Sequence, residues 1–461
     1  MIKDFRLDSL IGATQNIGEL YSEADLSLKD FMFALPDSVH TLRFSKVSIG
    51  TQKDQILFSD FSLVPKDHFG KPGNPVIDAK IEQLILKNNR LAEIQSTGKL
   101  DLREIRMINP KITVFLDSAK VEKQPKPGPS QSKASLIQDI LLSDFFIENG
   151  ALSLHRKGQG LIPRMDFQGV RFDVRDLNVN LLDQMQPFDL AHLVSKKLEF
   201  GVKDYSLLTP DSLYKITIGS LDFKDNDLVL DKIYYRPVRG NYSLQRKLPY
   251  QTTATTARVE KIRITTIDPQ AFLEKKLIKA DEVIIQSPQI EMFRDKRYPI
   301  DSSAFKQMPQ QMMQHANVDL DLISLRVRDG ALEYFEFAPK GLVPGRMLLD
   351  QINVDLAPFY LRKAGEVYPT DKVRVGIETH IMGASKVSLD AVMYFSEKYP
   401  MDVQVSMDTF AFAEANDFLS KTMFVEAVDG TVTDGNWEFK LNEDEAIGQM
   451  EFGYTLSLIH I

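Results

Sequence analysis

The sequence predicts a mainly β protein that is elongated, with two tandem modules, a third β-rich region at the C-terminus and a few short helices. Three observations predict this class. A long segment of the chain is repeated, apolar and polar residues alternate with a period of two, and stretches with helical periodicity are short and few. A period of two places one face of a strand in apolar surroundings and the other face in water.

The repeat keeps one order along most of the chain. The segment "IENGALSLHRKGQGLIP" from Ile147 matches "VRDGALEYFEFAPKGLVP" from Val327, an offset of 180 residues. Three earlier pairs have offsets of 174, 178 and 178 residues: "KDFMFALPDSVHTL" with "KDYSLLTPDSLYKI", "AKIEQLIL" with "ARVEKIRI", and "NPKITVFLD" with "SPQIEMFRD". Four collinear matches indicate two copies of one module, at residues 27–200 and 201–365.

The remaining segments flank these copies. Residues 1–26 are expected to be the end of a preceding module or an N-terminal extension, and residues 366–454 form the C-terminal β region. The final "LSLIHI" breaks the alternation and looks like translated adapter sequence. We therefore expect residues 455–461 to be an artefactual tail and the natural chain to continue past Tyr454.

Helices and loops are predicted by local composition. Residues 120–135 are rich in Pro, Lys and Ser without apolar periodicity, which predicts a mobile insertion. The pair Asp268-Pro269 has the form of an N-cap followed by proline at the first helical position. Short helical segments are expected near Ser135, Asp183, Asp268, Phe305 and Phe412.

Two dipeptides predict tight turns. Asn149-Gly150 and Asp329-Gly330 each lie between alternating segments. A two-residue hairpin needs positive φ at both central positions, which Asn or Asp followed by Gly supplies at least cost. We therefore expect a β-hairpin at each dipeptide.

Composition limits the function. The net charge of −8 argues against a nucleic-acid binder, although it leaves room for a local basic edge that meets a membrane. The absence of cysteine excludes disulfides and thiolate chemistry. No apolar run approaches the ~18–20 residues that span a bilayer, and the start has no apolar core of a secretory signal. We expect either a cytoplasmic protein or a chain that begins inside a longer one.

The chain carries no recognisable catalytic or cofactor motif. None of the seven histidines has a partner at metal-ligand spacing. Asp319 and Asp321 share one face of a strand, where a cation site competes with the simpler reading of a wet strand face. Gly158 and Gly160 make only a G-x-G, which favours an ordinary loop over a phosphate cradle. We expect no metal, no cofactor and no enzymatic activity.

The C-terminal run "DGTVTDGNWEFKLNEDEAIGQMEFGY" resembles the closing segment of the AsmA-like family of diderm bacteria, and the two modules resemble that family more loosely. The resemblance implies a curled, antiparallel-rich β-sheet with an apolar inner trough that conducts lipid across the envelope. It also implies a periplasmic location, with anchoring to the inner membrane through a segment that this chain lacks. The implied partners are phospholipid or another amphiphile and the inner and outer membranes.

The apolar residues around the repeated motif have two readings, a packed core or the lining of a lipid trough. The alternation alone cannot distinguish them, because an apolar strand face is covered either by a second sheet or by a bound amphiphile. A cluster of Met308, Met312 and Met313 similarly suits a packed cap or an adaptable lid. The candidate lining residues are Ile112, Val114, Leu152, Leu154, Phe172, Val174, Ile290, Met292, Leu332, Tyr334, Val354 and Leu356.

The favoured function is a non-enzymatic envelope protein that holds or conducts lipid and supports outer-membrane lipid homeostasis or assembly. One alternative is a structural or adhesive protein made of closed β-sandwiches with no lipid ligand. Another is a carbohydrate-active β protein, which the single tryptophan, Trp437, disfavours mildly. A continuous, open apolar face would favour lipid over the sandwich.

Overall fold

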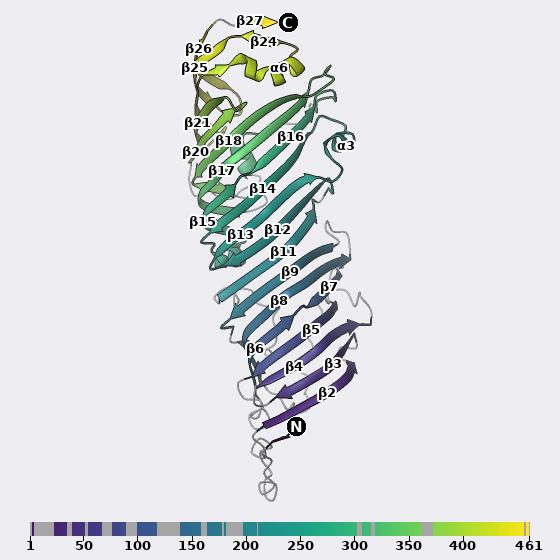
Figure 1. The fold of residues 1–461 in the computed structure, drawn as a ribbon. Coiled ribbons are helices and arrows are strands. Elements are labelled where there is room, and N and C mark those ends of the chain that lie inside the picture. The colour runs from purple at the N-terminus through teal and green to yellow at the C-terminus, as the bar shows by residue number, and fades with distance from the viewer. Residues whose placement is uncertain are drawn as a thin grey trace, which may run out of the picture. The chain divides into compact units, whose positions relative to one another are not determined.

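The structure is a computed structural model of the chain, and its described part covers most of the sequence. It is mainly β, as predicted (Figure 1). The chain divides into two compact units, one of residues 1–206 and 222–225 and the other of residues 207–221 and 226–461. The described residues are 2–3, 23–34, 39–50, 54–66, 76–88, 99–117, 139–157, 164–177, 179–180, 197–209, 211–301, 307–314, 319–361, 372–455 and 458–460.

The first unit contains one mixed sheet. Strands β2 to β5 run antiparallel to their neighbours, and β6 and β7 continue one another along β5. β8 runs parallel to β6 and β7, and β9 and then β11 follow antiparallel. The strands are β1 (Ile2–Lys3), β2 (Glu23–Ala34), β3 (His40–Gly50), β4 (Gln55–Pro65), β5 (Val76–Asn88), β6 (Lys99–Ile108), β7 (Lys111–Asp117), β8 (Asp139–Lys157), β9 (Arg164–Arg175), β10 (Val179–Asn180) and β11 (Lys197–Leu208).

The second unit repeats this plan and extends it. β13 pairs with β14, β15 and β16 lie beside β14, and β17 runs parallel to both. Its strands are most of β12 (Tyr214–Lys224), β13 (Asp227–Pro237), β14 (Thr253–Thr265), β15 (Leu277–Gln286), β16 (Gln289–Asp295), β17 (Asp319–Phe337), β18 (Gly345–Ala357), β19 (Phe359–Leu361), β20 (Lys372–Ile381), β21 (Ser385–Tyr394), β22 (Met401–Met407), β23 (Phe410–Ala411), β24 (Glu426–Asp429), β25 (Thr431–Leu441), β26 (Ala446–Tyr454) and β27 (Leu458–His460).

The C-terminal β region continues this second sheet. β18 is followed by β20, β21, β22, β25 and β26, each antiparallel to the one before. β24 and β27 form a separate two-stranded sheet. The expected tail at residues 455–461 thus contributes a short strand at its described positions.

The strands of the two predicted copies follow the same order. β5, β6, β7 and β8 have 13, 10, 7 and 19 residues, and β14, β15, β16 and β17 have the same four lengths. The parallel step falls between corresponding strands in both copies. β2 and β11 begin at Glu23 and Lys197, so the copies start inside the segments placed before residues 27 and 201. The first four residues of β2 and of β11 resemble each other weakly in sequence, which is why the predicted boundaries fall within these strands.

Three of the predicted helices are present. α4 (Pro269–Lys275) begins after Asp268, whose carboxylate accepts a hydrogen bond from the Ala271 amide at 3.0 Å, as the N-cap prediction requires. α5 (Pro309–Gln314), η4 (Phe412–Ala415) and α6 (Asn416–Thr422) match the other two. The segment near Asp183 and the loop at 120–135 lie outside the described residues.

The predicted helix near Ser135 is wrong where it can be seen. β8 begins at Asp139, and its first residues pair with β6, Ile140 beside Leu100 and Leu142 beside Leu102. Pairing with a neighbouring strand outweighs the local helical pattern. The five-residue helix α3 (Asn241–Gln245) was not predicted, since Gly240 at its start provides no capping side chain.

The two predicted hairpins are also wrong. β8 and β17 each run without reversal through Asn149-Gly150 and Asp329-Gly330. Asn149 and Asp329 do have positive φ, at 51° and 53°, but the following glycines do not. The pairing with β9 and β18 instead shifts register at these points. One positive-φ residue makes a β-bulge that bends a strand, whereas a two-residue hairpin needs two.

Candidate functional site

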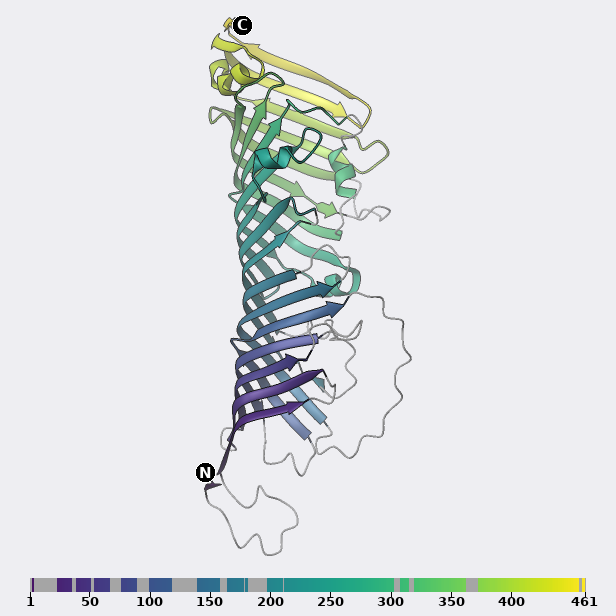
Figure 2. The ribbon, with the colours of Figure 1, turned by 90° about the vertical axis from the view of Figure 1, so that its right-hand side faces the viewer.

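Polar residues with positive φ interrupt many of the strands near their middle. In the first unit they include Asp30, Asp60, Asn149 and Asp204, and Asn109 stands between β6 and β7. In the second unit they include Lys232, Asp329 and Gln351, and Ser287 stands between β15 and β16. Each such residue adds one position to the alternation. Two side chains that are three residues apart across the bulge therefore lie on the same face of the sheet. Figure 2 shows the strands of each unit from the side, where they bend along their length.

Gly150 demonstrates this return. A methyl group placed on Gly150 would lie 3.0 Å from Ile147 Cγ2 and 3.2 Å from Pro110 Cγ. Residues 147 and 150 therefore face the same way, although they are three apart. Ring contacts place further apolar side chains on this face. The centroid of the Phe44 ring on β3 lies 5.1 Å from that of Phe31 on β2 and 5.3 Å from that of Phe58 on β4.

The result is one continuous apolar face on the sheet of the first unit. Side chains in register across β2, β3, β4, β5, β6, β8, β9 and β11 are all apolar on this face. A row on one side of the bulges consists of Leu28, Val47, Phe58, Leu84, Met107, Ile147, Phe172 and Phe200. The next row contains Ile49, Ile56, Leu86, Ile105, Phe145, Val174 and Leu198.

The second unit has an apolar face of the same kind. It extends past the repeat into the C-terminal β region. One row crosses β13, β14, β15, β17, β18, β20, β21, β22, β25 and β26 and consists of Leu230, Ile262, Ile285, Val327, Val354, Ile377, Leu389, Val405, Trp437 and Met450.

This face is incompletely covered. In the second-unit row every residue from Leu230 to Trp437 is half-buried and Met450 is exposed. In the adjacent row of the same face, Val283, Ala391 and Val403 are buried. The substantial contacts of each described strand are to its neighbours in the sheet or to a short helix. Within the described residues, no second sheet is seen packed over the apolar face.

The predicted lining residues lie on this face, in two groups on either side of the bulges. In the first unit Ile112 is in register with Leu152, and Val114 with Leu154. Phe172 and Val174 pair instead with Ile147 and Phe145, further along β8. The second unit repeats the division, with Ile290 and Met292 beside Leu332 and Tyr334, and with Val354 and Leu356 beside Val327 and Leu325.

Two lining residues make further packing contacts. Val174 is fully buried in a cluster with Leu102, Leu142 and Leu177. Tyr334 has its ring 6.4 Å from Phe418 of α6, and its hydroxyl donates a hydrogen bond to Glu336 at 2.6 Å. Burial, with the Glu336 carboxylate beside it, raises the pKa of Tyr334 above the usual range. These two positions contribute to packing within the protein.

The opposite face of each sheet is charged. In the first unit Arg106 bonds to Glu104 at 2.7 Å and to Glu148, and its guanidinium lies 4.4 Å above the Phe146 ring. Burial alone would raise the pKa of Glu104, but hydrogen bonds from Arg106 and Lys87 outweigh it and hold that pKa below its usual value. In the second unit Arg328 bonds to Asp355 at 2.6 Å.

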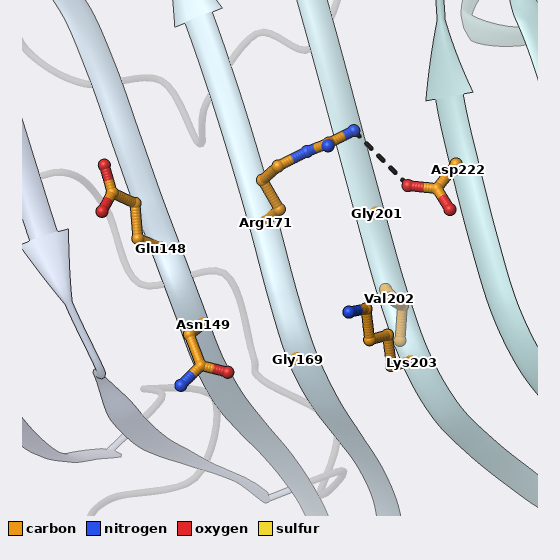
Figure 3. A pocket seen from close by; sticks show the side chains of 8 residues that line it. All are labelled: Glu148, Asn149, Gly169, Arg171, Gly201, Val202, Lys203 and Asp222. Atoms are coloured by element: carbon orange, nitrogen blue, oxygen red, sulfur yellow. Dashed lines mark hydrogen bonds and ion pairs between the residues drawn. The ribbon is translucent and has the colours of Figure 1, made fainter.

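A depression of about 240 Å³ lies on this charged face. Figure 3 shows Arg171 reaching toward Asp222, with Glu148, Asn149 and Lys203 around it. Arg171 and Asp222 are 3.4 Å apart and both side chains are nearly half exposed. Such an open ion pair has the character of a solvated surface, and it offers no enclosed reaction site.

Chemical sites are not evident in the described part of the chain. No group of three or more His, Asp or Glu side chains comes together there in a way that could hold a metal ion. Asp319 and Asp321 lie on β17 beside Leu277 and Lys279 of β15. Gly158 and Gly160 lie outside the described residues. Met312 of α5 is largely exposed, while Gln310 of the same helix is fully buried and bonds to the carbonyls of Tyr399 and Pro400.

The sequence reasoning missed part of the apolar face. It did not include β3, β4 or the strands after β18, and it left out Trp437. The sequence does contain a signal for these bulged strands. In several of them two apolar residues two apart are followed by a polar pair and then by two more apolar or small residues two apart, as in Ile56–Leu63 and Phe145–Leu152. A search for strict alternation reads the polar pair as a turn.

No described helix is long and apolar enough to cross a membrane. Comparison with models of known protein families and with curated proteins found no match for the chain.

Proposed function

We propose that this chain is a non-enzymatic protein that holds lipid acyl chains on the apolar faces of its sheets, in the manner of the AsmA-like proteins that its C-terminal run resembles. The observation that carries the proposal is the continuity of those faces. The row that contains Trp437 crosses ten strands, from Leu230 on β13 to Met450 on β26, and every side chain in it is apolar.

An apolar face of this size that is only partly covered favours an apolar ligand. Monomeric soluble proteins rarely leave large contiguous apolar patches in water, and such patches mark interaction sites. Acyl chains suit the face because they need no hydrogen bonds, and the face offers few. A small polar ligand would need convergent polar groups within the apolar surface, and the rows described above contain none.

The mechanism would be passive. Burying acyl chains contributes about 25 cal/mol per Å² of apolar surface removed from water. This contribution would be nearly equal at successive positions along a row such as Val354, Ile377 and Leu389, because adjacent rows present similar side chains. Bound lipid would therefore shift along the face of a unit with small differences in free energy.

The compartment and partners follow from the resemblance. We propose the periplasm of a diderm bacterium, phospholipid as the ligand, and a role in outer-membrane lipid homeostasis or assembly. The charged opposite face, with ion pairs such as Arg326 with Glu282 at 2.6 Å, is compatible with an aqueous compartment on that side.

The test is native mass spectrometry with lipid extraction on the full chain, produced in a diderm host and purified without detergent. Phospholipid is expected to accompany the wild-type chain. Ile112→Asp with Ile290→Asp should remove most of it, because each introduces a carboxylate on the apolar face.

A matched control uses the neighbouring residues of the same strands. Thr113→Asp with Gln289→Asp adds the same charge on the opposite face and should retain the lipid. A folded wild-type chain free of lipid would overturn the proposal and favour a structural or adhesive role. Equal loss in both pairs of variants would also overturn it.

A further inference from the structure

One rim of the second unit combines exposed apolar side chains with unpaired basic ones. The rim is made by three connections: residues 238–252 between β13 and β14, residues 296–301 after β16, and residues 338–344 between β17 and β18. They meet at one end of the sheet, because Thr253 pairs with Arg294, Asp295 with Phe337, and Glu336 with Gly345. We call these three connections the basic rim.

The basic rim is rigidly built. Gln251 donates its side-chain amide to the Tyr298 carbonyl at 2.8 Å and its backbone amide to the Pro299 carbonyl at 2.9 Å. The Lys296 amide donates to the Phe337 carbonyl at 3.0 Å. Beneath the rim, Leu244 of α3 is buried against Ala254, Phe293 and Phe337. The exposed side chains above are therefore held in place by a packed base.

The apolar side chains of the rim point into water. Leu342 is 91% exposed and Ile300 is 69% exposed. Leu342 and Val343 belong to the Gly-Leu-Val-Pro motif that follows the repeated strand, and the first copy carries Gly-Leu-Ile-Pro at the matching place in its sequence. The lipid-holding face does not account for this motif. The exposed apolar residues of the rim are Val238, Tyr242, Tyr250, Ile300, Leu342 and Val343.

The same connections are basic within an acidic chain. They contain six basic residues and one acidic residue, a net charge of +5, although the whole chain carries −8. Lys296 and Arg297 pair with Glu336 and Asp295. The other four cations have no ion-pair partner in the described part of the chain, namely Arg239, Arg246, Lys247 and Lys340.

We propose that the basic rim docks on the surface of an anionic lipid bilayer. Unpaired Lys and Arg side chains are attracted by anionic head groups. Tyrosine prefers the membrane–water interface, and exposed Leu, Ile and Val side chains gain by insertion at the boundary with the acyl chains. The charge selects an anionic surface, and the apolar tips distinguish a bilayer from a polyanion without an apolar interior. The inference goes beyond the proposed function and stands without it.

The test is flotation of the full chain with vesicles of phosphatidylcholine and phosphatidylglycerol in equal amounts, and with vesicles of phosphatidylcholine alone. The wild-type chain should float with the anionic vesicles and remain behind with the neutral ones. Arg246→Glu with Lys247→Glu should weaken binding about tenfold or more, since reversal removes two attractions and adds two repulsions. Leu342→Asp with Val343→Asp should weaken it comparably.

Matched controls lie away from the rim in the same unit. Lys275→Glu with Lys279→Glu makes the same change of charge near the opposite ends of the strands, and Ile323→Asp replaces another exposed apolar side chain. Both should float like the wild type, as should Ile112→Asp with Ile290→Asp, which tests the apolar face separately. Failure of the wild type to float, equal flotation on neutral vesicles, or rim variants that float like the wild type would each overturn the proposal.

Discussion

Asn149 donates its side-chain amide to the side-chain oxygen of Asn109 at 2.7 Å, and both residues have positive φ, at 51° and 50°. The bulge in β8 is thus joined to the break between β6 and β7. In the second copy Asp329 occupies the bulge in β17, with a φ of 53°, and Ser287 occupies the break between β15 and β16, with a φ of 46°. Aligned bulges keep the apolar residues of neighbouring strands in register on both sides of the bend.

The bulge at Asp329 should depend on its backbone conformation. Asp329→Val should destabilise the protein by about 1–2 kcal/mol, because a β-branched side chain tolerates positive φ poorly. Asp329→Gly should have little effect, since glycine adopts this conformation freely. Urea denaturation followed by circular dichroism measures both. Equal losses in the two variants would show that the side-chain contacts of Asp329 matter more than its φ.

Gly330 should be intolerant of a side chain. A methyl group there would lie 3.1 Å from Pro288 Cγ and 3.3 Å from Ile352 Cβ. Gly330→Val should therefore lower the free energy of unfolding by about 1–3 kcal/mol through overpacking.

A control for this substitution lies on β20. The nearest atom to a methyl group on Gly376 would be Asp390 Oδ1 at 3.8 Å, an ordinary contact. Gly376→Ala should leave the urea midpoint nearly unchanged. A comparable fall in both variants would mean that loss of glycine, rather than crowding at Pro288, is responsible.

The ion pair between Asp295 and Arg297 should make stability depend on pH. Hydrogen bonds from Arg297, one of them at 2.7 Å, lower the pKa of the buried Asp295 carboxyl. A carboxyl with a lowered folded pKa stabilises the protein above its unfolded value of about 3.9, and that stability is lost as pH falls through the folded pKa. Asp295→Asn should thus be less stable than the wild type at neutral pH, and the difference should shrink below about pH 4. Thermal melts across this range measure it, and a difference that is constant with pH would contradict the prediction.

Trp437 should report lipid on the apolar face. It is the single tryptophan of the chain and stands in register between Val405 and Met450. Phospholipids with brominated acyl chains should quench its fluorescence if the proposed function is correct, because quenching requires close contact. Val405→Asp should reduce the quenching, whereas Gln404→Asp, on the opposite face of β22, should leave it intact. Undiminished fluorescence in a chain shown by mass spectrometry to carry these lipids would place the acyl chains elsewhere.

The sequence by itself determined the β class and, between one bulge and the next, the residues that share a strand face. Those properties are local, since a period of two fixes which side chains of an unbulged stretch point together whatever the neighbouring strand is. The capping of α4 by Asp268 was predictable for the same reason. The alternation placed Ile112 and Val114 on one strand face and Leu152 and Leu154 on another, and only the pairing of β7 with β8 brings the two pairs into register.

Only the tertiary structure decided that Asn149-Gly150 and Asp329-Gly330 are bulges, and that the apolar face continues to Trp437. A hairpin and a bulge can begin from the same dipeptide, and the choice depends on whether a neighbouring strand offers hydrogen bonds beyond it. β9 and β18 do so on both sides of the bulge. Pairing between residues far apart in the sequence also placed Phe172 beside Ile147 and Val174 beside Phe145. The alternation within any one strand does not specify these neighbours.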